Sequence, residues 1–149
     1  MPKKYQLPDF LQGRVPEVVY DRWLERKARA HVRRDRKRNN DTATRQAYKE
    51  AIHRAVLLSG GRDWYTGEDL AWELISSYNN EESRIGRRKY KAAFALLPTV
   101  DHVGDGLGPA DFRICAWRTN DAKNDLSYQE FVELCQRVVE FSNRQVANL

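Results

Sequence analysis

The sequence predicts an α+β domain that is mostly helical and contains one short strand pair. Three observations predict this class. The chain has 149 residues, and its four Trp, seven Tyr and five Phe supply enough apolar area for one core. Helical spacing of apolar residues recurs along most of the chain. Strand-like runs occur at residues 99–103 and 112–117, on either side of a glycine-rich loop.

Two helices are predicted in the N-terminal part of the chain. Pro16 suits the first turn of a helix, and helical spacing continues until the polar residues 39–41 end it. A second helix is predicted over about residues 44–58, with Asp41 or Thr42 as its N-cap.

The charge of the chain changes at the glycine pair of residues 60–61. Residues 1–60 carry 15 Lys/Arg and seven Asp/Glu, whereas residues 61–149 carry 11 and 14. We therefore divide the chain into a basic helical extension over residues 1–60 and a second domain over residues 61–149. A basic segment beside an acidic one is typical of an arm that binds a polyanion. The alternative interpretation of the basic run is a solvated helix face.

The second domain is predicted to begin with a short helix over about residues 69–77. A further short helix is predicted to begin near Thr119, after the strand pair. Ser127 then starts the last helix in a capping box with Glu130. We expect this last helix to be buried through apolar residues at helical spacing, namely Phe131, Leu134, Cys135 and Val138.

Residues suited to phosphodiester cleavage gather around the strand pair. Asp101 and His102 end the first strand, Asp111 precedes the second, and Asn120 and Lys123 lie on one face of the next helix. Imidazole titrates near neutral pH, so His102 can deprotonate a water molecule. Carboxylate and amide oxygens suit Mg²⁺, which makes Asp101 and Asn120 candidate metal ligands. Lys123 can steady a phosphate.

The same segments resemble a known family. Residues 100–103 (Val-Asp-His-Val), 111–115 (Asp-Phe-Arg-Ile-Cys) and 120–125 (Asn-Asp-Ala-Lys-Asn-Asp) are similar to the HNH nuclease motif, a ββα-metal hairpin and helix. The resemblance covers roughly residues 62–140. It implies a metal-dependent DNA endonuclease that uses Mg²⁺, or Mn²⁺ in its place, and leaves 5′-phosphate and 3′-hydroxyl ends.

The resemblance also implies a role for each site residue, within an HNH-like nuclease domain over residues 61–149. His102 is the general base, Asp101 and Asn120 hold the metal, and Lys123 matches the lysine of the family's Asn-x-x-Lys. The middle position of the motif, usually an Asn that positions the histidine or the loop backbone, is Asp111 here. Asp111 is therefore a catalytic candidate whose role is open. Two cysteines cannot close a tetrahedral site, so no structural zinc is expected.

Double-stranded DNA is the expected partner, and no membrane partner is expected because no uncharged apolar run approaches about 20 residues. A homodimer would supply the two sites that cutting both strands requires. A cytoplasmic location is expected because the first residues lack an apolar signal segment. The candidate DNA contacts are nine basic residues: Arg29, Arg33, Arg34, Arg36, Arg38, Arg87, Arg88, Lys89 and Arg118.

An alternative function belongs to a different class. The chain would then be a non-catalytic nucleic-acid-binding protein that combines a degenerate HNH fold with a basic helical arm. The presence of Asp101, His102 and Asn120 favours the enzyme, because a degenerate member is expected to have lost His102 or Asn120. The other histidines, His31 and His53, have no companion ligands nearby in the sequence and are interpreted as surface or packing residues.

Overall fold

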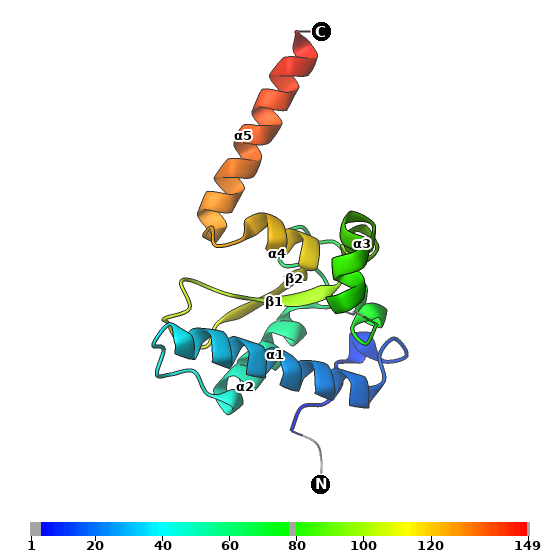
Figure 1. The fold of residues 1–149 in the computed structure, drawn as a ribbon, viewed down its shortest axis with the longest axis vertical. Coiled ribbons are helices and arrows are strands. Elements are labelled where there is room, and N and C mark those ends of the chain that lie inside the picture. Colours follow the sequence, from blue (N-terminus) through cyan, green and yellow to red (C-terminus); the bar gives the residue numbers. More distant parts are fainter. Residues whose placement is uncertain (1–3, 78–79, 149) are drawn as a thin grey trace.

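The computed structural model describes residues 4–77 and 80–148 (Figure 1). Its sheet is a hairpin in which β1 (Pro98–His102) pairs antiparallel with β2 (Phe112–Ala116). Helices make up most of the remaining regular structure. The predicted class, α+β and mostly helical, is therefore confirmed, and the two strands lie within one residue of their predicted bounds.

The hairpin presents one apolar face to the helices beneath it. Val100 lies opposite Ile114, and His102 lies opposite Phe112. Val100, Phe112 and Ile114 are buried, as expected for alternate strand positions that face a core. This register brings the end of β1, and His102 with it, to the edge of the core.

Two long helices form the layer under the hairpin. α1 (Glu17–Lys37) starts after Pro16, and α2 (Arg45–Ser59) ends at Gly60 in the left-handed conformation, which glycine adopts without steric cost. The N-cap of α2 is Thr44, whose hydroxyl accepts the backbone N–H of Ala47 at 3.2 Å. The predicted caps, Asp41 and Thr42, were therefore wrong. Thr42 instead donates its N–H and hydroxyl to Asn40 Oδ1.

The core joins the two segments on either side of residues 60–61. Trp23 of α1 packs edge-on against Trp72, with ring centroids 5.3 Å apart, and α2 packs against β2. The buried apolar side chains of both segments form one cluster. The basic extension thus covers the inner face of the hairpin.

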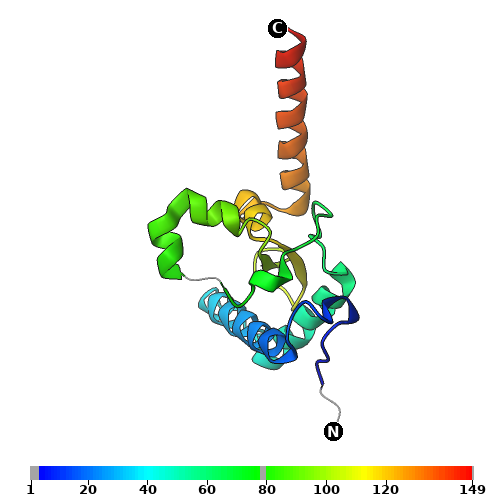
Figure 2. The same cartoon turned by 90° about the vertical axis from the view of Figure 1, so that its right-hand side faces the viewer.

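Two helices follow the hairpin. α4 (Trp117–Lys123) begins directly after β2 and packs on both strands. α5 (Tyr128–Ala147) starts with the predicted capping box, in which Ser127 and Glu130 exchange hydrogen bonds. Figures 1 and 2 show that α5 then extends away from the rest of the molecule.

The predicted burial of α5 was wrong. None of its residues, all of which the structure describes, is buried; Phe131 is half-buried, and Leu134, Cys135 and Val138 are exposed. Helical spacing shows that a helix has an apolar face, but it does not show that another element covers that face.

The predicted helix over residues 69–77 was also wrong. Only a 3₁₀ turn, η2 (Trp72–Leu74), forms there. The backbone N–H groups of Leu74 and Ile75 donate to the carbonyls three residues earlier, those of Ala71 and Trp72, which is the 3₁₀ pattern and not the α-helical one.

The remaining elements lie at the periphery. η1 (Asp9–Leu11) precedes α1, and α3 (Asn80–Ala93) is broken at Arg87, where φ is +47°. Figure 2 shows the resulting kink of α3. Among the described residues, no helix combines the length and the apolar character that crossing a membrane requires.

Candidate active site

The end of β1 opens into a cavity of about 660 Å³. Side chains from three elements and from the loops beside them line it. The polar side chains from the three elements are His31, Arg34 and Asp35 of α1 with its C-cap Arg38, Asp101 and His102 of β1, and Asn120, Asp121 and Lys123 of α4. Four of the five predicted metal and catalytic residues therefore meet in one cavity, and Asp111 is the exception.

His102 is held by polar contacts at both ring nitrogens. Its Nδ1 lies 2.5 Å from Asp35 Oδ2, and its Nε2 lies 3.2 Å from the carbonyl oxygen of Pro109. The ring also packs against Phe112, with centroids 4.7 Å apart. Because only 7% of its side chain is exposed, the imidazole has little freedom to rotate.

Asp35 reaches His102 from the cavity side of α1. Its Oδ2 also accepts the hydroxyl of Tyr48 at 2.7 Å. Its Oδ1 is buried without a hydrogen-bond partner among the described residues. Burial and the nearby carboxylate of Asp35 raise the pKa of Tyr48, so this hydroxyl remains a donor.

Asp101 has two donors on one carboxylate oxygen. Its Oδ2 accepts the hydroxyl of Tyr65 at 2.5 Å and lies 3.1 Å from Lys123 Nζ. The side chains of Asp101 and Lys123 are only 11% and 8% exposed. Burial and the bond to Asp101 raise the pKa of Tyr65. Lys123 is therefore an ion-pair partner of Asp101 as well as a residue of the cavity wall.

Asn120 is positioned by the way α4 is anchored. The hydroxyl of Thr119 donates to Asp63 Oδ2 at 2.7 Å, and the backbone N–H of Trp117 donates to Leu97 at 2.8 Å. Since α4 directly follows β2, these bonds fix its first turn against the hairpin. Asn120 then lies on the cavity wall with Asp101.

The donor chemistry of Asp101 and Asn120 fits Mg²⁺. This ion prefers oxygen ligands, keeps several waters and is often held by one or two protein groups together with a phosphate. Among the described residues, no group of three or more His, Cys, Asp or Glu could hold a metal. A cation at Asp101 would share this carboxylate with the ammonium of Lys123.

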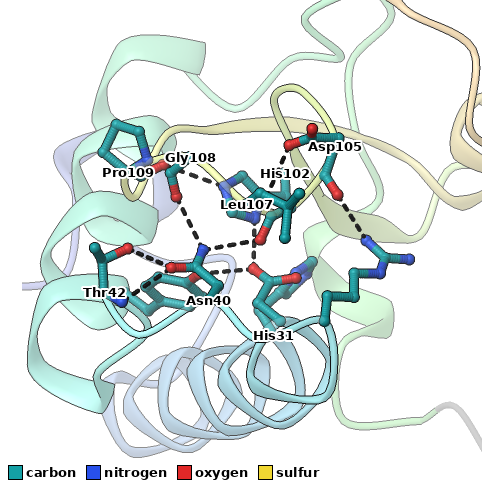
Figure 3. A network of polar contacts seen from close by, with 12 residues as sticks. His31, Asn40, Thr42, His102, Asp105, Leu107, Gly108 and Pro109 are labelled. Carbon is teal, nitrogen blue, oxygen red and sulfur yellow. Dashed lines mark hydrogen bonds and ion pairs between the residues drawn. The ribbon is translucent and has the colours of Figure 1, made fainter.

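The side chain that holds the loop between the strands is that of Asn40 and not that of Asp111. Figure 3 shows Asn40 facing the loop, and its Nδ2 donates to the carbonyls of Gly106 and Gly108 at 2.8 and 2.9 Å. Asp111 is exposed and pairs with Arg113 at 3.0 Å. The loop-positioning contact that the resemblance assigned to the middle position is thus made by a residue of the N-terminal extension.

The predicted DNA-contact residues point to different surfaces. Arg34 and Arg38 line the cavity, whereas Arg29 and Arg33 line a separate hollow. Arg36 donates to the carbonyl of Ala43 at 2.9 Å. Arg87, Arg88 and Lys89 of α3 are exposed and do not line the cavity, and the exposed Arg118 pairs with Glu68.

His31 is a cavity residue as well as a packing residue. Its Nε2 lies 3.1 Å from the carbonyl of Val100, which accepts a hydrogen bond from it, and its ring packs edge-on against Phe112. Burial, together with the charges of Arg34 and Lys27, lowers its pKa to about 3. His31 is therefore neutral at pH 7 and ties α1 to β1 beside Asp101.

Sequence reasoning missed four residues of this site: Asp35, Asn40, Tyr48 and Tyr65. One signal was available for Asp35, an acidic residue inside a run of basic ones and four residues after His31. That spacing puts both on one helix face. The other three had no local signal, because the contacts that place them in the site join residues eight or more positions apart.

The cavity therefore combines a buried imidazole, hard oxygen ligands, a paired lysine and two arginines. As chemical types, an imidazole can exchange a proton, carboxylate and amide oxygens can bind a divalent cation, and guanidinium groups can bind a phosphate. Comparison of this chain with protein-family models, curated proteins and solved structures found no match.

Proposed function

We propose that this protein is a metal-dependent DNA endonuclease of the HNH type, whose ββα-metal core is β1, β2 and α4. One observation carries the proposal. Asp101 and His102 from the end of β1 share a cavity with Asn120 and Lys123 from α4. These are the residue types that hydrolysis of a phosphodiester by a general base and a divalent cation requires.

His102 acts as the general base. It accepts a proton from water while the water oxygen bonds to phosphorus and the P–O3′ bond breaks; the 3′-oxygen then takes a proton from solvent. The contact of Nε2 with Pro109 is longer than that of Nδ1 with Asp35, and it comes from a largely exposed loop. Nε2 is therefore the nitrogen that exchanges its loop partner for the attacking water.

The other cavity residues bind and orient the substrate. Arg34 and Arg38 have exposed side chains at the cavity, where guanidinium groups bind phosphates of the DNA backbone. Asp101 and Asn120 would hold Mg²⁺. Bound there, the ion would neutralise charge on the phosphate and on the leaving oxygen.

One observation favours the alternative, a non-catalytic nucleic-acid-binding protein. Both ring nitrogens of His102 are engaged by protein acceptors, so a water must displace one of them before His102 can act. Cleavage is therefore the property that separates the two functions.

Supercoiled plasmid incubated with the protein and Mg²⁺ provides the test, with EDTA as the control. We expect nicked or linear plasmid in Mg²⁺ alone and a loss of about 10²–10⁴-fold in His102→Ala. His53→Gln is the matched control, since His53 bonds to Tyr20 and does not line the cavity. Plasmid that is bound but left intact in both Mg²⁺ and Mn²⁺ would support the alternative. Linearisation without a nicked intermediate would indicate that two copies act together.

The metal ligands are tested by a second pair of variants. Asn120→Ala should cripple cleavage, with partial rescue by more Mg²⁺ or by Mn²⁺. Asn124 lines the same cavity one helical turn later and has φ +50°, so Asn124→Gly preserves its backbone and should do much less. If Asn124 is essential and Asn120 dispensable, the assignment of the metal ligand is wrong by one turn.

A further inference from the structure

Two buried aspartates of this protein have very different surroundings. Asp63 is 2% exposed and has donors on both carboxylate oxygens. Its Oδ1 accepts the backbone N–H groups of Tyr65 and Thr66, and its Oδ2 accepts the N–H of Ala116 and the hydroxyl of Thr119. This is the pattern of a carboxylate that holds backbone together.

Asp35 is fully buried and shows a different pattern. Among the described residues, its carboxylate contacts two side chains, those of Tyr48 and His102, and both contacts are made by Oδ2. Its Oδ1 has no hydrogen-bond partner among the described residues. A buried carboxylate is costly unless it is well paired, and the Asp35 carboxylate accepts no backbone N–H in the part of the chain that the structure describes. The burial of Asp35 is therefore explained by its contact with the imidazole of His102.

We propose that Asp35 is a positioning residue that orients the imidazole of His102 for the reaction. The inference rests on the proposed function and adds to it a residue from the N-terminal extension. Asp35 Oδ2 fixes the Nδ1 side of the ring, and the opposite nitrogen, Nε2, then faces the loop and the water that replaces Pro109. In a Ser-His-Asp triad, the aspartate bonds to one nitrogen of the imidazole and thereby sets the orientation and the tautomer of the ring.

Tyr48 supports this arrangement from α2. Its hydroxyl donates to the same oxygen of Asp35, and its ring packs edge-on against His102 and Phe112, with centroids 5.7 and 5.0 Å apart. The carboxylate therefore cannot rotate toward the cavity without losing Tyr48. Three elements, α1, α2 and β1, together hold one ring.

The test compares cleavage with binding in the full-length protein. The rate of plasmid cleavage in Mg²⁺ is measured at saturating protein, and the dissociation constant for the same plasmid is measured in EDTA. Asp35→Asn should lower the rate by at least about tenfold while binding changes less than twofold. Tyr48→Phe keeps the ring and should lower the rate by about two- to tenfold. Asp21→Asn, the same change on α1 outside the cavity, is the matched control.

A second measurement does not depend on activity. The ring nitrogens of His102 are observed by proton–nitrogen NMR at one pH in the metal-free protein. We expect their signals to change in Asp35→Asn and in Tyr48→Phe, and to stay in place in Asp21→Asn. Thermal unfolding of each variant shows whether it is folded.

The outcomes separate this inference from the proposed function. An unchanged cleavage rate in folded Asp35→Asn would overturn the positioning role, as would a loss of binding and stability with no loss of rate. If Asp35→Asn does not fold, the cleavage rate of Tyr48→Phe and the NMR signals of His102 in that variant decide whether the positioning role holds. If the wild-type protein leaves plasmid intact, the proposed function has failed, and the NMR comparison still decides whether Asp35 orients His102.

Discussion

At the residue scale, a few buried polar side chains determine how the cavity is built. Asn40 holds the loop, Asp35 holds His102, and Asp63 holds the first turn of α4. Buried polar groups of this kind persist because they are hydrogen-bonded, and removing one partner costs more than the bond itself is worth. The cavity is thus part of the folded core.

The stability of the protein should fall in mild acid because of His31. Its pKa is about 3 in the folded state, where burial disfavours the charged ring, and about 6.5 when unfolded. Between these values the unfolded chain binds more protons, so the stability is complete above pH 6.5 and is lost as the pH falls toward 3. The free energy of unfolding should fall by up to about 1.4 kcal/mol per pH unit in this range. Urea unfolding at a series of pH values measures this loss.

His31→Gln is the comparison for this prediction. It keeps a donor that can reach Val100 and removes the titrating ring. Its stability should depend less on pH than that of the wild type between about pH 6 and pH 4.5. Parallel curves for the two proteins would exclude His31 as the cause.

At the element scale, α1 serves the core and the cavity with different faces. Trp23 and Leu24 pack in the core, while His31 and Asp35 line the cavity. The basic residues of the helix divide in the same way, because they cannot all lie on one side. If DNA binds at His102 as we propose, the position of each arginine on the helix determines whether it can reach that DNA.

Two double variants test this division of the arginines. Arg34→Gln with Arg38→Gln should weaken DNA binding about equally for all sequences, because phosphate contacts position without specifying. The slope of log affinity against log salt should become shallower by roughly 2. Arg29→Gln with Arg33→Gln removes the same amount of charge from the face of α1 that does not line the cavity, and it should change the slope much less. Equal effects of the two pairs would show that only net charge matters.

α5 should contribute little to the stability of the rest of the chain. Its contacts with Tyr65 come from Tyr128 and Phe131, in its first turn, and the residues from Glu133 to Asn148 are exposed. Ending the chain after Glu133 should therefore change the free energy of unfolding by less than about 1 kcal/mol, as thermal or urea unfolding can show. A large loss, or a change in the mass of the particle in solution, would show that the apolar face of α5 is covered there.

At the scale of the whole molecule, the two segments share one core. The hairpin has two strands, and an isolated hairpin is at best marginally stable in water. Phe112 and Ile114 are buried in the same cluster as α1 and α2. The N-terminal extension is thus part of the support for the candidate active site.

Residues 61–149 expressed alone should accordingly lack cooperative unfolding. Their apolar hairpin face would be exposed without α1 and α2, and that area is needed to offset the entropy of folding. Circular dichroism during heating provides the measurement, and addition of residues 1–60 should restore a transition. Cooperative unfolding of the fragment alone would show that residues 60–61 are a true domain boundary.

Local patterns determined much of this protein. The alternation of apolar residues predicted the hairpin, and the Ser127 capping box predicted the start of α5. Asp101, His102, Asn120 and Lys123 were predicted to act together and do line one cavity. They lie within 23 residues, on β1 and on α4, with β2 between these two elements, so hairpin pairing and helix spacing are enough to bring them together.

Only the tertiary structure decided what surrounds those four residues. Asp35 is 67 residues from His102, and Asn40 is 66 residues from Gly106. The period of a helix shows which residues share a face, but not which face meets the hairpin. The helical period also did not show that no other element would cover the apolar face of α5. Contacts between distant residues depend on how separate elements pack. The hydrophobic effect is non-directional, so an apolar pattern does not specify which elements will meet. The polar partners at their edges are therefore settled only when the whole core has formed.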